Sequence, residues 1–377
     1  MRILYDHQTF MYQSIGGISQ YFTQLMISIS SYATPVLSLD NTKNEYAKDI
    51  AKFSIVPLKI EHGTSRIKRI ADRILGINPR KKNSEMSLSA LIQGKYDIFH
   101  PTAYDPYCLT IPKRAPMVIT FHDCIQENFP EFFSPDDNMT VCKRAYISKA
   151  DAIICISKYT KSQFLKYFEY DEKKIFIVPH GIDHGFYNNA GRNGENYLNK
   201  YGKYLLFVGG RQGYKNWLFW LRAVAPIILK NEHTNILCTG RCFTTQEKNL
   251  IVELGLKDRV FSVSLSRYEM PAVYGGARCF FYPSLEEGFG LPTLEAMASG
   301  CPVALSDIPV MREVAGESAL FFEPKNSRAI AETCENLLSD DELCARLKKA
   351  GLEHSLNFNW QRTAKMTMSV YEQVIGL

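Results

Sequence analysis

Short runs of apolar residues alternate along the whole chain with longer segments in which apolar residues recur at helical spacing. Runs that are apolar on both faces predict strands of a parallel sheet, because helices cover both faces of such a sheet. In the first half the predicted strands are RILYD, YDIFH (96–100), MVITFHD (117–123), DAIICIS (151–157) and KIFIVPHG (174–181). In the second half they are KYLLFVGG (203–210), NILCTG (235–240), VFSVSL (260–265), CFFYPS (279–284), CPVALSD (301–307) and ALFFEP (319–324).

This alternation predicts an α/β protein of two doubly wound domains, each with about five or six parallel strands. A length of 377 residues fits two domains of about 150–190 residues. The segment NNAGRNGENYLNKYGK is polar and rich in Gly and Asn, so we expect the domains to join near residues 183–202. The first domain should then cover residues 1–185 and the second residues 186–357.

The composition is that of an ordinary soluble protein, with 46% hydrophobic and 22% charged residues. The start, MRILYDHQTF, lacks the apolar stretch of a signal peptide, and no run reaches the ~18–20 apolar residues of a membrane-spanning helix. We therefore expect a cytoplasmic protein. Most of the ten cysteines lie in apolar runs and are expected in the core, and the isolated pair Cys238 and Cys242 does not predict a metal site.

The net charge of +5 is concentrated in one segment. The stretch SRIKRIADRILGINPRKK (65–82) holds seven Lys or Arg residues against one Asp, with apolar residues at helical spacing beside them. One interpretation is a solvated surface helix or loop, and the other is a patch that contacts an anionic membrane surface. Nucleic acid is not expected as a partner, because no aromatic residues are interleaved with the basic ones and no binding motif is present.

The stretch SLEEGFGLPTLEAMASG (284–300) predicts an anion site. Pro292 suits the first turn of a helix and Gly300 its end, so a helix should run from about Pro292 to Ser299. Free N–H groups at the start of this helix, approached closely because of the glycines, suit a phosphate or diphosphate. Lys215 and Arg211 follow another predicted strand and could neutralise the same anion.

Two acids flank this turn, Glu287 before it and Glu295 in the helix. Carboxylates only accept hydrogen bonds, so they suit hydroxyl groups rather than a phosphate. An anion with hydroxyl groups on either side describes a nucleotide sugar. The alternative is structural, with Glu295 as a partner of the helix dipole and Glu287 as an ordinary loop acid.

Several segments resemble the retaining glycosyltransferases of family 4, which have the GT-B fold. EEGFGLPTLEAMASGCPV is similar to the signature of that family, in which two glutamates with seven residues between them bracket a Gly-rich turn. Further similar segments are IGGISQYF, TFHDCIQENFPEFF, VPHGID, FVGGRQGYKN and SDIPVMREVAGESALFFEP. The resemblance implies two Rossmann-like domains that face each other across a cleft. The N-terminal domain would bind the acceptor and the C-terminal domain the nucleotide-sugar donor, with a last helix, about 358–377, packing back on the first domain.

The resemblance also implies roles for single residues. Glu287 would contact the hexose of the donor, Glu295 would hold the ribose, and Lys215 would bind the diphosphate. The backbone of the Gly-rich turn would cap that diphosphate, with Gly288, Phe289, Gly290 and Leu291.

On the acceptor side, Gly16 and Gly17 would keep the first loop close to the phosphate, and His122 would lie by the anomeric carbon, next to Asp123. One departure concerns the arginines that many members place around the phosphate-binding loop. This chain has Gly210 and Tyr214 at those positions, and Arg211 lies one residue later.

The family resemblance implies retention of the anomeric configuration without a metal, and no cofactor beyond the co-substrate. Nothing resembles a DxD pair, since Asp136 and Asp137 are adjacent. Retaining glycosidases use a carboxylate nucleophile, but the cleft candidates His100, His122 and Asp123 offer no carboxylate pair. We therefore expect front-face attack in which the leaving phosphate accepts the acceptor proton and His122 only positions groups by hydrogen bonding. His180, near the join between the domains, is expected to be structural.

The sugar is not encoded in any residue that we can interpret. Overall resemblance to bacterial surface-polysaccharide mannosyltransferases favours mannose from GDP-mannose, with a glycan or a polyprenyl-diphosphate-linked glycan as acceptor at the inner membrane face. Two alternatives remain, a GT-B sugar-nucleotide epimerase and a non-catalytic subunit that binds nucleotide sugars. The presence of Glu287, Glu295 and Lys215 together favours a hexosyltransferase over the non-catalytic subunit.

Overall fold

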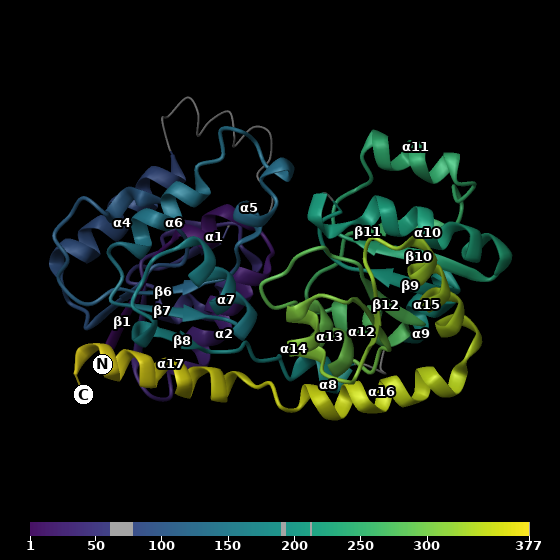
Figure 1. Cartoon of the computed structure of the whole chain (residues 1–377). Coiled ribbons are helices and arrows are strands. Elements are labelled where there is room, and N and C mark those ends of the chain that lie inside the picture. Colours follow the sequence, from purple (N-terminus) through teal and green to yellow (C-terminus); the bar gives the residue numbers. More distant parts are fainter. Residues whose placement is uncertain (61–77, 190–193, 212, 377) are drawn as a thin grey trace.

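The computed structural model describes residues 1–60, 78–189, 194–211 and 213–376. Over these ranges the chain forms two α/β lobes joined side by side, with the last two helices along one edge of both (Figure 1). This confirms the predicted class of two doubly wound domains. Residues 65–77 of the predicted basic segment lie outside the described residues.

The N-terminal domain contains six parallel strands in the order β2-β1-β5-β6-β7-β8. A single parallel bridge between Phe99 and Met117 joins its two three-stranded parts. All five predicted strands are present, and β2 is an additional strand that was not predicted. The strands are β1 (Arg2–Tyr5), β2 (Thr34–Leu37), β5 (Ile98–His100), β6 (Val118–Phe121), β7 (Ala152–Cys155) and β8 (Ile175–Ile177). A separate two-stranded ladder pairs β3 (Asn41–Thr42) with β4 (Lys59–Ile60).

The C-terminal domain repeats this arrangement, with the order β11-β10-β9-β12-β13-β14 and parallel pairing throughout. All six predicted strands are present: β9 (Lys203–Phe207), β10 (Thr234–Thr239), β11 (Val260–Val263), β12 (Cys279–Tyr282), β13 (Val303–Ser306) and β14 (Leu320–Phe322). In both sheets the strand order reverses beside the first strand, which places a ligand crevice at the carboxyl ends of β1 and β5 and of β9 and β12.

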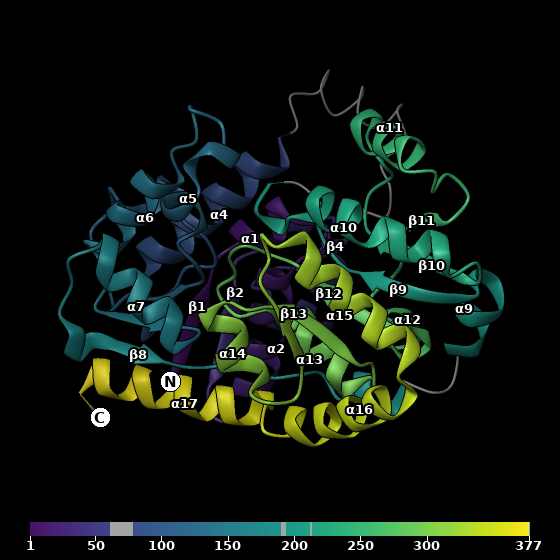
Figure 2. The ribbon, with the colours of Figure 1, turned by 45° about the vertical axis from the view of Figure 1, so that its right-hand side comes forward.

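Helices cover both faces of each sheet (Figures 1 and 2). In the N-terminal domain they are α1 (Gln8–Tyr12), α2 (Gly17–Ile29), α4 (Pro79–Gln93), α5 (Ile125–Asn128), α6 (Met139–Ile147) and α7 (Lys158–Tyr167). On the C-terminal domain they are α8 (Gly185–Asn189), α9 (Gly194–Tyr201), α10 (Trp217–Lys230), α11 (Thr245–Glu253), α12 (Met270–Gly276), α13 (Leu291–Ala298), α14 (Pro309–Ala315) and α15 (Ser327–Ser339).

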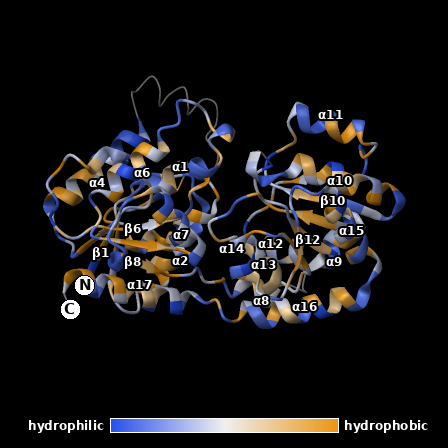
Figure 3. Ribbon diagram, viewed as in Figure 1, coloured by the Kyte–Doolittle hydropathy of each residue, from blue (hydrophilic) through white to orange (hydrophobic). Residues whose placement is uncertain are grey.

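The strands carry the hydrophobic core, and the long outer helices carry both hydrophobic and hydrophilic residues (Figure 3). Of the ten free cysteines, nine are buried, as predicted, and Cys242 is exposed. No helix among the described residues is long and apolar enough to cross a bilayer.

The last two helices run along different domains. α16 (Asp341–Ser355) packs on α13, whereas α17 (Trp360–Ile375) packs on α2 and β7 of the N-terminal domain. Trp360, Ala364, Met368 and Tyr371 recur at helical spacing and are all buried in the core of that domain. The chain therefore crosses between the domains a second time after α16.

Tyr371 connects this last helix to the core of the N-terminal domain through hydrogen bonds. Its hydroxyl lies 2.6 Å from Nδ1 of His100 and 3.1 Å from the hydroxyl of Tyr5, and the side chain is fully buried. Nε2 of His100 lies 2.9 Å from the hydroxyl of Thr120, so both ring nitrogens have partners inside the core. Burial lowers the pKa of His100 to about 3, and its role is structural.

We predict that Tyr371→Phe destabilises the protein, because it leaves the buried ring nitrogen of His100 without a partner. A buried polar group left unsatisfied costs about 1–3 kcal/mol, so thermal unfolding should begin several degrees lower. Tyr32→Phe, at a tyrosine that is 47% exposed, is the matched control. Equal melting temperatures for the two variants would contradict the prediction.

Candidate functional site

The predicted anion site is a tight turn between β12 and α13. Gly290 occupies the position before the helix with a φ of 89°, a left-handed conformation that glycine adopts without strain. α13 spans Leu291–Ala298, with Pro292 in its first turn and Gly300 at a φ of 69° beyond its end, which agrees with the prediction to one residue. No hydrogen bond among the described residues uses the N–H groups of Phe289 and Gly290.

Glu287 and Lys215 meet at this turn. Nζ of Lys215 lies 2.6 Å from the carboxylate of Glu287 and 3.2 Å from the hydroxyl of Tyr282, which ends β12. The ammonium group also lies over the rings of Tyr214 and Tyr282, at 5.1 and 5.2 Å from their centroids. The loops that follow the neighbouring strands β9 and β12 thus bring one acid and one base together at the crevice.

Glu295 lies on α13 and is only 8% exposed. Its carboxylate accepts hydrogen bonds from Nε2 of Gln20, at 3.1 Å, and from the hydroxyl of Tyr274, at 3.2 Å. Gln20 belongs to α2 of the other domain, so this acid is contacted from both sides of the crevice. Burial raises the pKa of Glu295 to about 7.

His122 and Gly288 are in direct contact across the domains. A Cβ atom on Gly288 would lie 1.8 Å from the carbonyl oxygen of His122, so only glycine permits this approach. The His122 ring packs edge-on against Tyr21 at 5.4 Å, and its Nε2 is buried without a partner among the described residues. Burial lowers its pKa to about 4, so the ring is neutral at pH 7.

A column of stacked rings crosses the boundary between the domains beside this contact. Phe289 of the Gly-rich turn stacks on His180 at 4.8 Å, and His180 stacks on Tyr21 at 4.7 Å. Burial holds the pKa of His180 well below its usual value, so His180 acts as an aromatic spacer rather than a charge.

The other predicted acceptor-side residues also lie in the N-terminal domain. Gly16 and Gly17 begin α2, and a Cβ at Gly17 would meet nothing within 4 Å. The carboxylate of Asp123 accepts from the N–H of Ile125 at 3.1 Å and lies 3.8 Å from Nζ of Lys143.

Arg211 was predicted to contact the diphosphate, but its guanidinium already binds other groups of the protein. Its guanidinium donates to the carboxylate of Glu247 at 3.1 Å and to the carbonyl groups of Thr239, Arg241 and Cys242. The residue is 2% exposed. Arg211 therefore binds groups inside the C-terminal domain, where it joins the end of β10 to α11. It does not lie with Lys215 and Glu287.

Several residues at or next to the site had no predicted role, and some of them form contacts across the domains. Glu286 accepts from the hydroxyl of Tyr159 at 2.9 Å and from Asn128 at 3.2 Å, and burial raises its pKa to about 7. The other missed residues are Gln20, Tyr274, Tyr282, Ser157, Thr160 and Glu313. Two of them had a signal in the sequence, because Glu286 follows a predicted strand and Ser157 lies between a strand and a helical segment.

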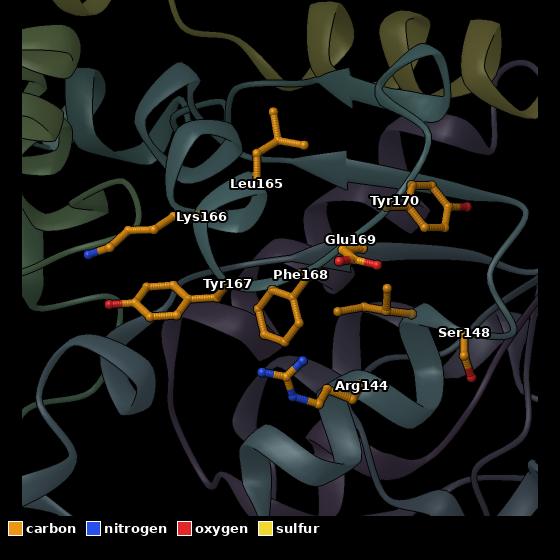
Figure 4. A pocket seen from close by; sticks show the side chains of 9 residues that line it. Arg144, Ser148, Leu165, Lys166, Tyr167, Phe168, Glu169 and Tyr170 are labelled. Carbon is orange, nitrogen blue, oxygen red and sulfur yellow. The ribbon is translucent and has the colours of Figure 1, made fainter.

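A separate surface cavity of about 630 Å³ lies in the N-terminal domain between α6 and α7 (Figure 4). None of the predicted site residues lines it. Its walls include Arg144, whose guanidinium lies 5.1 Å from the ring of Phe168, and Tyr167, whose hydroxyl donates to Asn128. Among the residues that the structure describes, no group of three or more His, Cys, Asp or Glu side chains could hold a metal ion.

We predict that Glu295→Gln changes how stability depends on pH. Because the folded state raises the carboxyl pKa from its usual value to about 7, the native protein binds more protons than the unfolded chain between about pH 4.5 and 7. This group therefore lowers the stability as pH rises through that window. Relative to the wild type, Glu295→Gln should gain stability from pH 5 to pH 8, on the order of 3 kcal/mol.

Thermal melts across this pH range measure the difference. Glu353→Gln, at an exposed acid on α16, is the control and should follow the wild type. If the stability of Glu295→Gln and that of the wild type change in parallel from pH 5 to pH 8, the pKa of Glu295 is not raised in the folded protein.

Comparison with known proteins agrees with the fold. A family model described as "Glycosyl transferases group 1" matches residues 194–354, and one described as "Glycosyltransferase Family 4" matches residues 60–186. The chain is 28% identical over 300 residues to O-antigen chain mannosyltransferase B of Escherichia coli, covering 75% of this chain and 76% of that protein. It is 28% identical over 232 residues to O-antigen chain mannosyltransferase RfbU of Salmonella typhimurium, covering 60% and 62%.

Solved structures share the whole architecture. Anabaena HepE in complex with UDP and glucose superposes with a TM-score of 0.74 over 98% of both chains, at 16% identity. WaaG, a glycosyltransferase involved in lipopolysaccharide biosynthesis, superposes with a TM-score of 0.69 over 100% of both chains, at 14% identity. The fold is the GT-B fold, and the chain belongs to the family 4 glycosyltransferases.

Proposed function

We propose that this protein is a retaining, metal-independent hexosyltransferase. It moves a hexose, with mannose favoured, from a nucleoside-diphosphate sugar to a glycan or lipid-linked glycan during surface-polysaccharide synthesis. The observation that carries the proposal is the meeting of Glu287, Lys215, Glu295 and the start of α13 at one crevice between the domains.

The diphosphate fits the start of α13. The N–H groups of Phe289, Gly290 and Leu291 and the positive end of the helix dipole favour an anion there. Lys215 adds a full positive charge beside them, and its ion pair with Glu287 would be exchanged for one with phosphate. Negative charge grows on the leaving diphosphate during the reaction, and each well-placed donor lowers the barrier by about 3–4 kcal/mol.

The two acids fit the sugars on either side of that anion. Glu295 already accepts from the amide of Gln20 and the hydroxyl of Tyr274, so a ribose hydroxyl would replace one donor with another. Glu287 would accept from a hydroxyl of the hexose once Lys215 turns to the phosphate.

The chemistry proceeds on one face of the sugar. The bond between the anomeric carbon and the phosphate oxygen breaks, the acceptor oxygen bonds to the same face, and the acceptor proton passes to that phosphate oxygen. His122 is neutral, and its buried Nε2 has no partner within the part of the chain that the structure describes, so it suits a hydrogen bond to a substrate hydroxyl rather than the removal of a proton.

The relatives support the choice of sugar and acceptor. Two of them are O-antigen mannosyltransferases, which supports mannose and GDP-mannose and a polysaccharide acceptor, including a polyprenyl-diphosphate-linked glycan. Such an acceptor would place the enzyme in the cytoplasm at the inner face of the membrane. A contact of residues 65–82 with anionic lipid remains a prediction.

We predict that one class of nucleotide sugar raises the melting temperature of the wild type, with or without EDTA. A panel of GDP-, UDP-, ADP- and TDP-sugars is the measurement, and a ligand at 100 times its Kd adds about 2.7 kcal/mol of stability. Glu295→Ala should lose the shift, whereas Glu353→Ala should keep it.

No shift with any nucleotide sugar, or a shift abolished by EDTA, would contradict this donor assignment. Release of nucleoside diphosphate only when an acceptor is present would separate a transferase from an epimerase. Donor binding without turnover on any glycan acceptor would instead favour a non-catalytic subunit.

Gly17→Ala offers a second test, because no contact among the described residues requires a glycine there. A Cβ at this position meets no atom within 4 Å, and alanine favours a helix by about 0.5–1 kcal/mol. We predict an unchanged or higher melting temperature together with weaker binding of the nucleotide sugar, because the methyl group enters the space of the diphosphate. Unchanged donor binding would place the diphosphate away from this loop.

A further inference from the structure

The first turn of α7 is one of the places where the two domains meet. α7 belongs to the N-terminal domain, directly after β7, and its start faces α14 and the Gly-rich turn of the C-terminal domain (Figures 1 and 2). The hydroxyl of Tyr159, on this turn, also donates a hydrogen bond to Glu286 of the other domain, at 2.9 Å.

A carboxylate of the C-terminal domain caps this helix. The first N–H groups of a helix have no partners within it, and a side chain of the same segment usually supplies them. In α7 the N–H groups of Lys158 and Tyr159 donate to the two carboxylate oxygens of Glu313, at 2.7 and 2.9 Å. The next N–H, of Thr160, donates to the hydroxyl oxygen of Ser157 at 2.9 Å. Two of these three N–H groups are thus capped from the other domain.

The first turn of α7 also binds one carbonyl group of the Gly-rich turn before α13. The hydroxyl oxygens of Ser157 and Thr160 both lie 2.8 Å from the carbonyl oxygen of Gly288, and both residues are buried. In a trans peptide the C=O and the following N–H point in opposite directions, and the described residues contain no cis peptide. Since the Gly288 carbonyl points toward α7, the N–H of Phe289 points away from it.

We propose that the start of α7 is a positioning element for the diphosphate of the donor. Thr160, with Ser157, orients the peptide between Gly288 and Phe289 so that its N–H faces the diphosphate, and Glu313 holds α7 in place against the C-terminal domain. This inference rests on the proposed function and adds three residues to it, two of which lie in the N-terminal domain.

The arrangement couples closure of the domains to diphosphate binding. The contacts of Thr160 and Glu313 exist only while the domains are together, so a ligand that uses the oriented N–H favours the closed state. By reciprocity, a change that weakens closure also weakens the binding of that ligand. A ligand that makes no contact with the oriented N–H is not affected in this way.

Calorimetric titration separates these cases. The probes are whichever of GDP, UDP, ADP and TDP the wild type binds, together with the corresponding monophosphate. Thr160→Val keeps the shape of the side chain but loses the hydroxyl. The gain in affinity from monophosphate to diphosphate should fall about tenfold in Thr160→Val, and Thr160→Ser should restore it.

Glu313→Gln tests the cap in the same experiment. An amide offers one acceptor oxygen and no charge, so the diphosphate gain should fall about threefold. The controls are Ser162→Ala, whose hydroxyl bonds only within α7, and Glu317→Gln, an exposed acid just after α14. Both should keep the gain of the wild type.

An unchanged gain in Thr160→Val or in Glu313→Gln, in a variant that melts like the wild type, would overturn the proposal and leave the donor site intact. A wild type that binds none of the four nucleotides would overturn the donor assignment and this inference together. Measuring Glu313→Gln as well keeps the idea testable if Thr160→Val does not fold.

Discussion

The approach of the Gly288 backbone to the carbonyl group of His122 is the constraint on which the site depends. It allows the turn before α13 to lie directly against the end of β6 in the other domain. The next residue follows from it, since Phe289 then stacks on His180 of the other domain. Any side chain at position 288 would hold the two domains apart.

The crevice is polar, yet few of its charges lack partners. Lys215 neutralises Glu287, while Glu286 and Glu295 receive hydrogen bonds from neutral donors and have pKa values of about 7. Burying a full charge is costly unless a partner of opposite charge is present. A site that closes on an anionic donor therefore benefits from acids that are only partly charged near neutral pH.

The fold could be predicted from the sequence because apolar strands and amphipathic helices leave strong periodic signals. The strand β2 was missed because its sequence, TPVL, is short and contains a proline near its start. The turn at 287–291 and its helix could also be predicted, because glycine and proline carry local information. Arg211 could not, because a local pattern does not reveal that Glu247 and three carbonyl groups already surround its guanidinium.

The contacts of α7 could not be predicted for a related reason. Glu313 and Lys158 are 155 residues apart in the sequence, and their pairing depends on how the two domains face each other. A pattern shows that each strand end lies at a crevice edge, but it does not show which residues of opposite edges meet.

The closed arrangement is held on two sides that differ in chemistry. On one side the two chain crossings lie together, where the N–H of Ile182 donates to the carbonyl of Phe358 at 3.2 Å and Gly181 packs on the backbone of Trp360. On the other side Glu313, Thr160 and the Gly288 carbonyl meet. The first set of contacts lies where the chain itself passes from one domain to the other, so it can persist when the domains separate. The second set has no such connection and must form anew at each closure, which makes it the part of the boundary that a bound diphosphate can strengthen.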